Sequence, residues 1–105
     1  MKMKLFWTKK ARAEMLKIAR YIRKNFGEIA WQNFMDEVAQ TSSCLERMPN
    51  IGKVEPYLED LPDIYRSIVV TKNKIVYHLE ADTVVIDDFW DARQNPENLA
   101  NRVVS

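Results

Sequence analysis

Three apolar runs rich in β-branched residues follow one another in the second half of the chain. They lie at Tyr65–Thr71, Lys74–Leu79 and Thr83–Trp90, and short polar turns join them. Runs of about four to eight such residues, separated by a few turn residues, predict strands joined as hairpins. We therefore expect a small antiparallel sheet here, with one face that must be buried against another layer.

The first half of the chain supplies the helices that would form this layer. A short strand is expected at 3–7, followed by Thr8 as the N-cap of a helix over about 9–25, in which apolar residues recur at helical spacing. Gly27 separates this helix from a second one over about 28–47. So short a connection predicts an antiparallel helical hairpin.

These elements give the order β-α-α-β-β-β, an α+β fold with the helical hairpin packed on the sheet. A weakly indicated strand at Lys53–Leu58, interrupted by Pro56, opens the hairpin region. Asn95–Pro96 is typical of an N-cap and a first helical position, so a short C-terminal helix is also expected. The 105 residues match the usual size of one domain, and we predict a single domain over 1–105.

Composition and charge limit the functional classes. No apolar run reaches the roughly 18 to 20 residues of a membrane span, and the N-terminus lacks the apolar core of a signal peptide. The single cysteine, Cys44, excludes an intrachain disulfide and fits a reducing cytoplasm. The net charge is +1, but residues 1–25 contain nine Lys or Arg and one acid, Glu14. Such a basic helix suits nucleic-acid phosphates or an acidic protein segment, but the charge distribution by itself favours a solvated helix face.

Alternation along the strands places the basic candidates. The helices take one face of the sheet, so we expect Arg66 and Lys74 to point outward together on the other face or at its rim. Structural roles stay open for the arginines. Arg66 is able to pair with an acid of the preceding loop, at Glu59, Asp60 or Asp63, and Arg93 with Asp91 or Glu97.

Other polar groups of the strands are expected to be structural. His78 lies mid-strand and is predicted to be a packed or surface imidazole, while Tyr65 and Tyr77 pack or anchor through their hydroxyls. Trp90, at a strand end, is expected to be half exposed. The aspartates of the last strand lack the His or Glu that would complete a metal site, so we expect neither a metal nor another cofactor.

Taken in order, these segments resemble the RelE/ParE superfamily of bacterial type II toxin–antitoxin toxins. The resemblance covers almost the whole chain and rests on the strand with its helical hairpin, on LERMPNIGK, on YRSIVV followed by KIVYHLEADTVVI, and on the ending DARQNPENL. It implies a compact cytoplasmic toxin, neutralised by an antitoxin that wraps its surface. A homodimer or a hetero-oligomer with the antitoxin is compatible with it, and no membrane partner is expected.

The superfamily divides by target. RelE-like members resemble ribosome-dependent mRNA endonucleases, whose chemistry needs a base, cations that stabilise the phosphorane and an acid. The resemblance places Arg66, Lys74 and Arg93 at catalytic positions. Leu99, however, stands where a catalytic tyrosine is often found, and Ala92 where many relatives carry a histidine. Whether the chain is an enzyme therefore stays open.

These departures favour the ParE-like branch, whose members resemble inhibitors of DNA gyrase. We expect Arg66, Lys53, Trp90 and Arg93 to contact the antitoxin or the target. A RelE-like mRNA endonuclease acting on the ribosome is the first alternative. A remnant that has lost toxicity and only binds an antitoxin as a co-repressor is the second.

Overall fold

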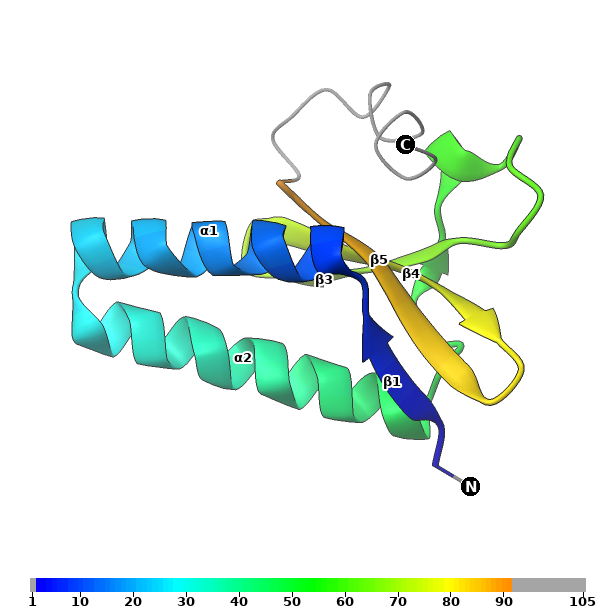
Figure 1. Cartoon of the computed structure of the whole chain (residues 1–105), viewed down its shortest axis with the longest axis horizontal. Coiled ribbons are helices and arrows are strands. Elements are labelled where there is room, and N and C mark those ends of the chain that lie inside the picture. Colours follow the sequence, from blue (N-terminus) through cyan, green and yellow to red (C-terminus); the bar gives the residue numbers. More distant parts are fainter. Residues whose placement is uncertain (1, 92–105) are drawn as a thin grey trace.

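The structure, a computed structural model, describes residues 2–91 and has two layers (Figure 1). Two antiparallel helices, α1 (Lys9–Phe26) and α2 (Glu28–Arg47), pack on one face of a five-stranded sheet with the order β1-β5-β4-β3-β2. The predicted α+β class and order of elements are confirmed. Within residues 2–91, no helix is both long enough and apolar enough to cross a membrane.

The helical hairpin forms where the sequence indicates. The Thr8 hydroxyl accepts a hydrogen bond from the Ala11 amide at 3.1 Å, as an N-cap should, and α1 ends at Gly27, whose φ of 94° favours glycine. Arg23 then fastens the two helices together. Its guanidinium donates a 2.7 Å hydrogen bond to Glu28 and lies 4.8 Å from the centre of the Trp31 ring.

The strands are β1 (Lys4–Trp7), β2 (Lys53–Val54), β3 (Arg66–Val70), β4 (Asn73–Glu80) and β5 (Thr83–Asp91). The two hairpins β3–β4 and β4–β5 are antiparallel, as predicted. The sheet as a whole is mixed, because β1 runs parallel to β5. Only a tight turn forces neighbouring strands to be antiparallel, and β1 reaches the rest of the sheet through two helices.

Two local predictions need correction, and a third is not tested by the described residues. The strand expected at Lys53–Leu58 stops after Val54, since Pro56 lacks an N–H and opens a short 3-10 turn, Pro56–Leu58. The turn between β3 and β4 consists of Thr71 and Lys72, one residue earlier than predicted, and Thr71 adopts a φ of 59°. The C-terminal helix expected from Asn95–Pro96 lies outside the described residues.

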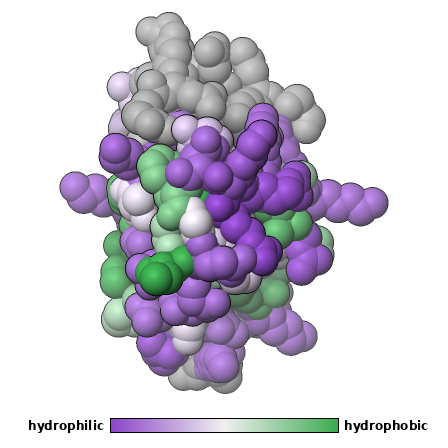
Figure 2. Space-filling model, turned by 90° about the vertical axis from the view of Figure 1, so that its left-hand side faces the viewer, coloured by the Kyte–Doolittle hydropathy of each residue, from purple (hydrophilic) through white to green (hydrophobic). Residues whose placement is uncertain are grey.

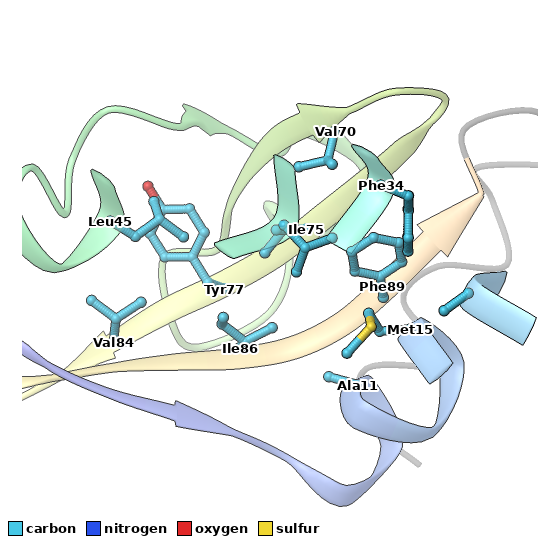
Figure 3. Close-up of a cluster of buried hydrophobic side chains, with 12 residues drawn as sticks. Ala11, Met15, Phe34, Leu45, Val70, Ile75, Tyr77, Val84, Ile86 and Phe89 are labelled. Carbon is cyan, nitrogen blue, oxygen red and sulfur yellow. The ribbon is translucent and has the colours of Figure 1, made fainter. Parts of the chain in front are cut away.

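Both faces of the sheet carry apolar clusters. The main core lies between the helices and the sheet, where Phe34 and Val38 of α2 meet Ile75, Ile86 and Phe89 (Figure 3). On the opposite face, a smaller cluster gathers under the loop between β2 and β3, and its members are Leu58, Tyr65, Val76 and Trp90. Trp90 is therefore buried, with 2% of its surface exposed, where half exposure was expected.

Candidate functional site

Arg66 and Lys74 lie on opposite faces of the sheet, so the expectation that they point outward together is wrong. Arg66 of β3 is paired across the strands with Tyr77, which belongs to the helix-side core. Lys74 is paired with Val69 on one side and Trp90 on the other, and Trp90 belongs to the opposite cluster. Directly paired residues share a face, and this pairing decides the orientation. The alternation of residues along the strands does not determine the pairing register or which face of the sheet packs against the helices.

Lys74 is held by a buried carboxylate. Its Nζ lies 3.2 Å from both carboxylate oxygens of Glu55, a side chain that is only 1% exposed. The Ser67 hydroxyl donates a further hydrogen bond of 2.6 Å to the same carboxylate. A buried carboxylate needs such compensation because desolvation penalises its charge. The positive charge of Lys74 is therefore neutralised within the fold.

Beside this pair lies a shallow hollow of about 430 Å³ at the β2 edge of the sheet. Lys74, Glu55 and Ser67 form its polar side, and the exposed side chains of Val54 and Val69 form much of its apolar side. Lys53, which is also exposed, stands at the rim. The hollow therefore offers a partner one exposed cation and an apolar contact surface.

Arg66 has a structural partner other than the acids expected for it. Its guanidinium donates to the main-chain carbonyl oxygens of Gly52, at 2.9 Å, and of Asn50, at 3.4 Å. The Tyr77 hydroxyl fastens the same loop, since it accepts from the Gly52 amide at 2.9 Å and donates to the Pro49 carbonyl at 2.7 Å. The prediction that Tyr77 is anchored through its hydroxyl is confirmed. Arg66 and Tyr77 thus fix the approach of the chain to β2.

Gly52 is required for this arrangement by its lack of a side chain. A Cβ atom there would lie 2.7 Å from the Tyr77 hydroxyl oxygen and 2.9 Å from the Ser67 carbonyl oxygen. Both distances are shorter than real carbon contacts allow. The loop is able to lie this close to the sheet only with glycine at this position.

A second polar cluster surrounds His78 on the face opposite the helices. Its Nδ1 lies 2.6 Å from Asp87 Oδ2 and its Nε2 lies 2.9 Å from Glu80 Oε1, so both ring nitrogens meet a carboxylate. Asp87 is an extra residue of β5, because Val76 pairs with Asp88 while the next residue of β4 pairs with Ile86. This β-bulge turns Asp87 toward the imidazole. The Tyr65 ring stands edge-on to the imidazole, with 5.3 Å between the ring centres.

The charge state of this cluster follows from burial and hydrogen bonding. Burial disfavours the imidazolium, but the hydrogen bonds to Glu80 and Asp87 outweigh it and raise the pKa of His78 above its ordinary 6.5. Burial also raises the pKa of Asp87, against the opposing hydrogen bond from His78. The folded state thus favours a protonated His78. Its two nitrogens are already occupied, and its 7% exposure selects the packed imidazole from the two predicted roles, packed or on the surface.

The structure does not bring the candidate catalytic groups together. His78 lies four residues beyond Lys74 along β4, a separation of about 13 Å at strand geometry, and Arg66 lies on the other face. Arg93, Ala92 and Leu99 lie outside the described residues. Among residues 2–91, no group of three or more His, Cys, Asp or Glu side chains is arranged to hold a metal ion.

Sequence reasoning missed three polar groups that the structure joins to the predicted ones. Glu55 binds Lys74, Ser67 donates a hydrogen bond to Glu55, and Asp87 binds His78. The alternation of β3 and β4 does place Ser67 and Lys74 on one face, which was a usable signal. Glu55 follows a two-residue strand, and Asp87 sits in a bulge, so no periodic pattern indicated either of them.

Comparison with known proteins agrees with this architecture. A solved structure described as the chromosomal ParDE toxin–antitoxin system from P. aeruginosa superposes with a TM-score of 0.71 at 17% identity, covering 87% of this chain and 97% of that one. Comparison with curated proteins gives no significant match. The family model for the ParE toxin of the type II toxin–antitoxin system parDE matches residues 5–96. The chain therefore belongs to the ParE toxin family of type II toxin–antitoxin systems.

Proposed function

We propose that this chain arrests bacterial growth by acting on DNA gyrase in the cytoplasm, with all of residues 1–105 forming one toxin domain. The observation that carries the proposal is the family match over residues 5–96. The resemblance to gyrase inhibitors of the ParE-like branch supplies the target. In this function the toxin binds a protein–DNA complex and needs no bond-breaking chemistry of its own.

The geometry of the described residues supports this choice over mRNA cleavage. A ribonuclease of the RelE-like kind needs a proton acceptor beside its cations. Here Lys74 is neutralised by Glu55, Arg66 is bound to main-chain carbonyl oxygens, and both nitrogens of His78 are engaged by carboxylates. The sequence adds Leu99 and Ala92 at the positions of the tyrosine and histidine. Together these features favour a binding function.

An antitoxin partner is the second part of the proposal, and the helical hairpin offers a surface for it. A groove of about 690 Å³ lies between the joined ends of the two helices, beside Gly27, and the β3–β4 turn. Tyr21, Phe26 and Ile29 are at least half exposed at this end of the molecule, where Figure 2 shows apolar side chains among polar ones. Exposed apolar side chains gathered at one place favour a protein partner. The complex would be a hetero-oligomer.

Growth and cleavage assays test the function. Induction of the chain without an antitoxin is expected to stop growth, and co-expression of an antitoxin encoded by the adjacent gene should restore it. Purified gyrase, plasmid and toxin should then accumulate broken DNA, whereas translating ribosomes with the toxin should leave mRNA intact. Cleaved mRNA with intact plasmid would replace the proposal by the RelE-like alternative. Unimpaired growth would instead favour the alternative of a remnant that has lost toxicity and only binds an antitoxin.

Variants locate the contact surface. We propose that Lys53, Arg66 and Arg93 contact the target or the antitoxin, whereas the burial of Trp90 does not support direct contact by that side chain. Lys53→Ala is expected to weaken growth arrest while leaving stability unchanged, since the side chain is exposed. Arg47→Ala, an exposed cation on α2, serves as the matched control. Equal toxicity of the two variants would show that Lys53 does not belong to the proposed contact surface.

A further inference from the structure

The outer face of α1 carries a stripe of exposed cations. At 100° per residue, six basic side chains fall within about 140° of the helix circumference. All are exposed, and they are Lys9, Arg12, Lys17, Arg20, Arg23 and Lys24. The buried residues Ala11, Met15 and Ala19 lie about 90° to 170° around the helix from the centre of the stripe, on the side that packs against β5 and α2. The stripe is therefore exposed along the length of α1, although Arg23 at its edge reaches α2 and Lys17 borders the groove beside the β3–β4 turn.

These charges are not compensated locally. Among the described residues, Arg23 is the only member of the stripe that forms an ion pair, with Glu28. The one acidic residue of α1, Glu14, lies about 130° around the helix from the centre of the stripe. The whole chain has a net charge of only +1, so the excess of positive charge on this helix face is a local feature of the surface. Repulsion between neighbouring like charges costs stability, which an anionic partner would relieve.

We infer that the outer face of α1, from Lys9 to Lys24, binds the phosphate backbone of duplex DNA. The choice of DNA among polyanions rests on the proposed function, in which the toxin acts on DNA held by gyrase. Lys9 and Lys24 are about 22 Å apart along a straight helix. Duplex DNA presents one phosphate per about 1.7 Å of axis, so several phosphates lie within reach of a rigid row of cations of this length.

The chemistry of the stripe separates duplex DNA from other anionic partners. Proteins that bind single-stranded nucleic acids stack bases on exposed aromatic rings. The stripe contains no aromatic residue, and the exposed ring of Tyr21 lies about 100° away from its centre. Its apolar content is the partly exposed Leu16 and Ala13, too little to anchor an acidic protein segment by hydrophobic contact. The proposed binding therefore uses contacts to phosphates only and does not depend on the base sequence of the DNA.

Salt dependence of binding tests the inference quantitatively. The affinity of the full chain for a 20-base-pair duplex is measured by fluorescence anisotropy between 50 and 200 mM salt. Five unpaired cations predict a slope of log K against log salt of about −4.5, a roughly 500-fold loss over this range. The double variant Arg12→Gln/Arg20→Gln should reduce the slope to about −2.7, a loss of about 40-fold. Lys17→Gln/Lys24→Gln should give the same reduction.

A control with the same change in net charge isolates the surface. Lys4→Gln/Arg47→Gln removes two exposed cations outside α1 and should keep the parent slope. No binding at 50 mM salt, or equal slopes for the parent and the α1 variants, would overturn the inference. Tighter binding of single-stranded RNA or of polyglutamate than of the duplex would overturn the assignment to DNA. The growth assay stands apart, because a chain that arrests growth without binding DNA refutes only this inference.

Discussion

The hydroxyl of Tyr77 is expected to be the main fastening of the loop before β2, and Tyr77→Phe tests this. The substitution keeps the ring, which lies in the helix-side core with its oxygen at the margin (Figure 3). It removes the acceptor of the Gly52 amide and the donor to the Pro49 carbonyl, both hydrogen bonds being shorter than 3 Å. The Gly52 amide is left buried without that partner, while the half-buried Pro49 is able to turn its carbonyl to water.

The magnitude follows from these two groups. An unsatisfied buried donor costs about 1–3 kcal/mol, and the rehydrated carbonyl adds little. We therefore expect a loss of about 2 kcal/mol in the free energy of unfolding, which lowers Tm by roughly 10 °C in a domain of this size. With a urea m-value of about 2 kcal/mol/M, the unfolding midpoint shifts by about 1 M and the slope stays unchanged.

Urea denaturation followed by tryptophan fluorescence measures this loss, and Tyr57→Phe is the control. Tyr57 is 49% exposed, so removing its hydroxyl should change stability by less than about 0.5 kcal/mol. Equal stabilities of the two variants would refute the reasoning, since the Tyr77 hydroxyl would then contribute nothing beyond a solvated phenol. A changed m-value would show instead that the substitution alters the compactness of one of the two states.

Three further changes probe the neighbouring features. Gly52→Ala should lower the free energy of unfolding by about 1–3 kcal/mol, because the new Cβ meets the Tyr77 hydroxyl, and thermal unfolding measures the loss. Glu55→Met should lower the free energy of unfolding by about 3 kcal/mol, because the Lys74 ammonium loses its compensating charge, and urea denaturation measures the loss. The double variant Glu55→Met/Lys74→Met should regain most of this stability. Equal stability of the single and double variants would argue against the ion pair. The stability that His78 contributes should be complete below pH 6.5 and lost as the pH rises through its higher folded-state pKa. Urea midpoints between pH 6 and pH 9 should fall accordingly, and His78→Gln should flatten that trend.

The elements of this fold could be predicted from the sequence because local signals mark them. Thr8 caps one end of α1 and Gly27 ends it, and the β-branched runs place β3, β4 and β5. The partner of β1 left no local signal, because parallel pairing with β5 is decided by packing between residues distant in the chain. The early end of the strand expected at Lys53–Leu58 does have a local cause, because Pro56 opens a 3-10 turn.

The candidate site was harder to predict than the fold. Arg66 and Lys74 were identified as charged strand residues, but their faces depend on register, which a two-residue period does not determine. Their partners come from irregular positions. Glu55 lies between a short strand and a 3-10 turn, and the carbonyl that binds Arg66 belongs to the Gly52 loop. Such contacts follow from three-dimensional closure and leave no periodic trace in the sequence.

The parallel pairing of β1 with β5 has a consequence for how the protein is made. Lys4 lies beside Thr83, a separation of 79 residues, so β1 leaves the ribosome before the other described strands but pairs only with the last of them. Contacts of such long range slow folding, because much of the chain must be ordered before they form. The helical hairpin is complete long before β5 exists, and its apolar face has to wait for the sheet. The native fold therefore forms only after β5 has been made, and until then the helices offer that face to any partner already present.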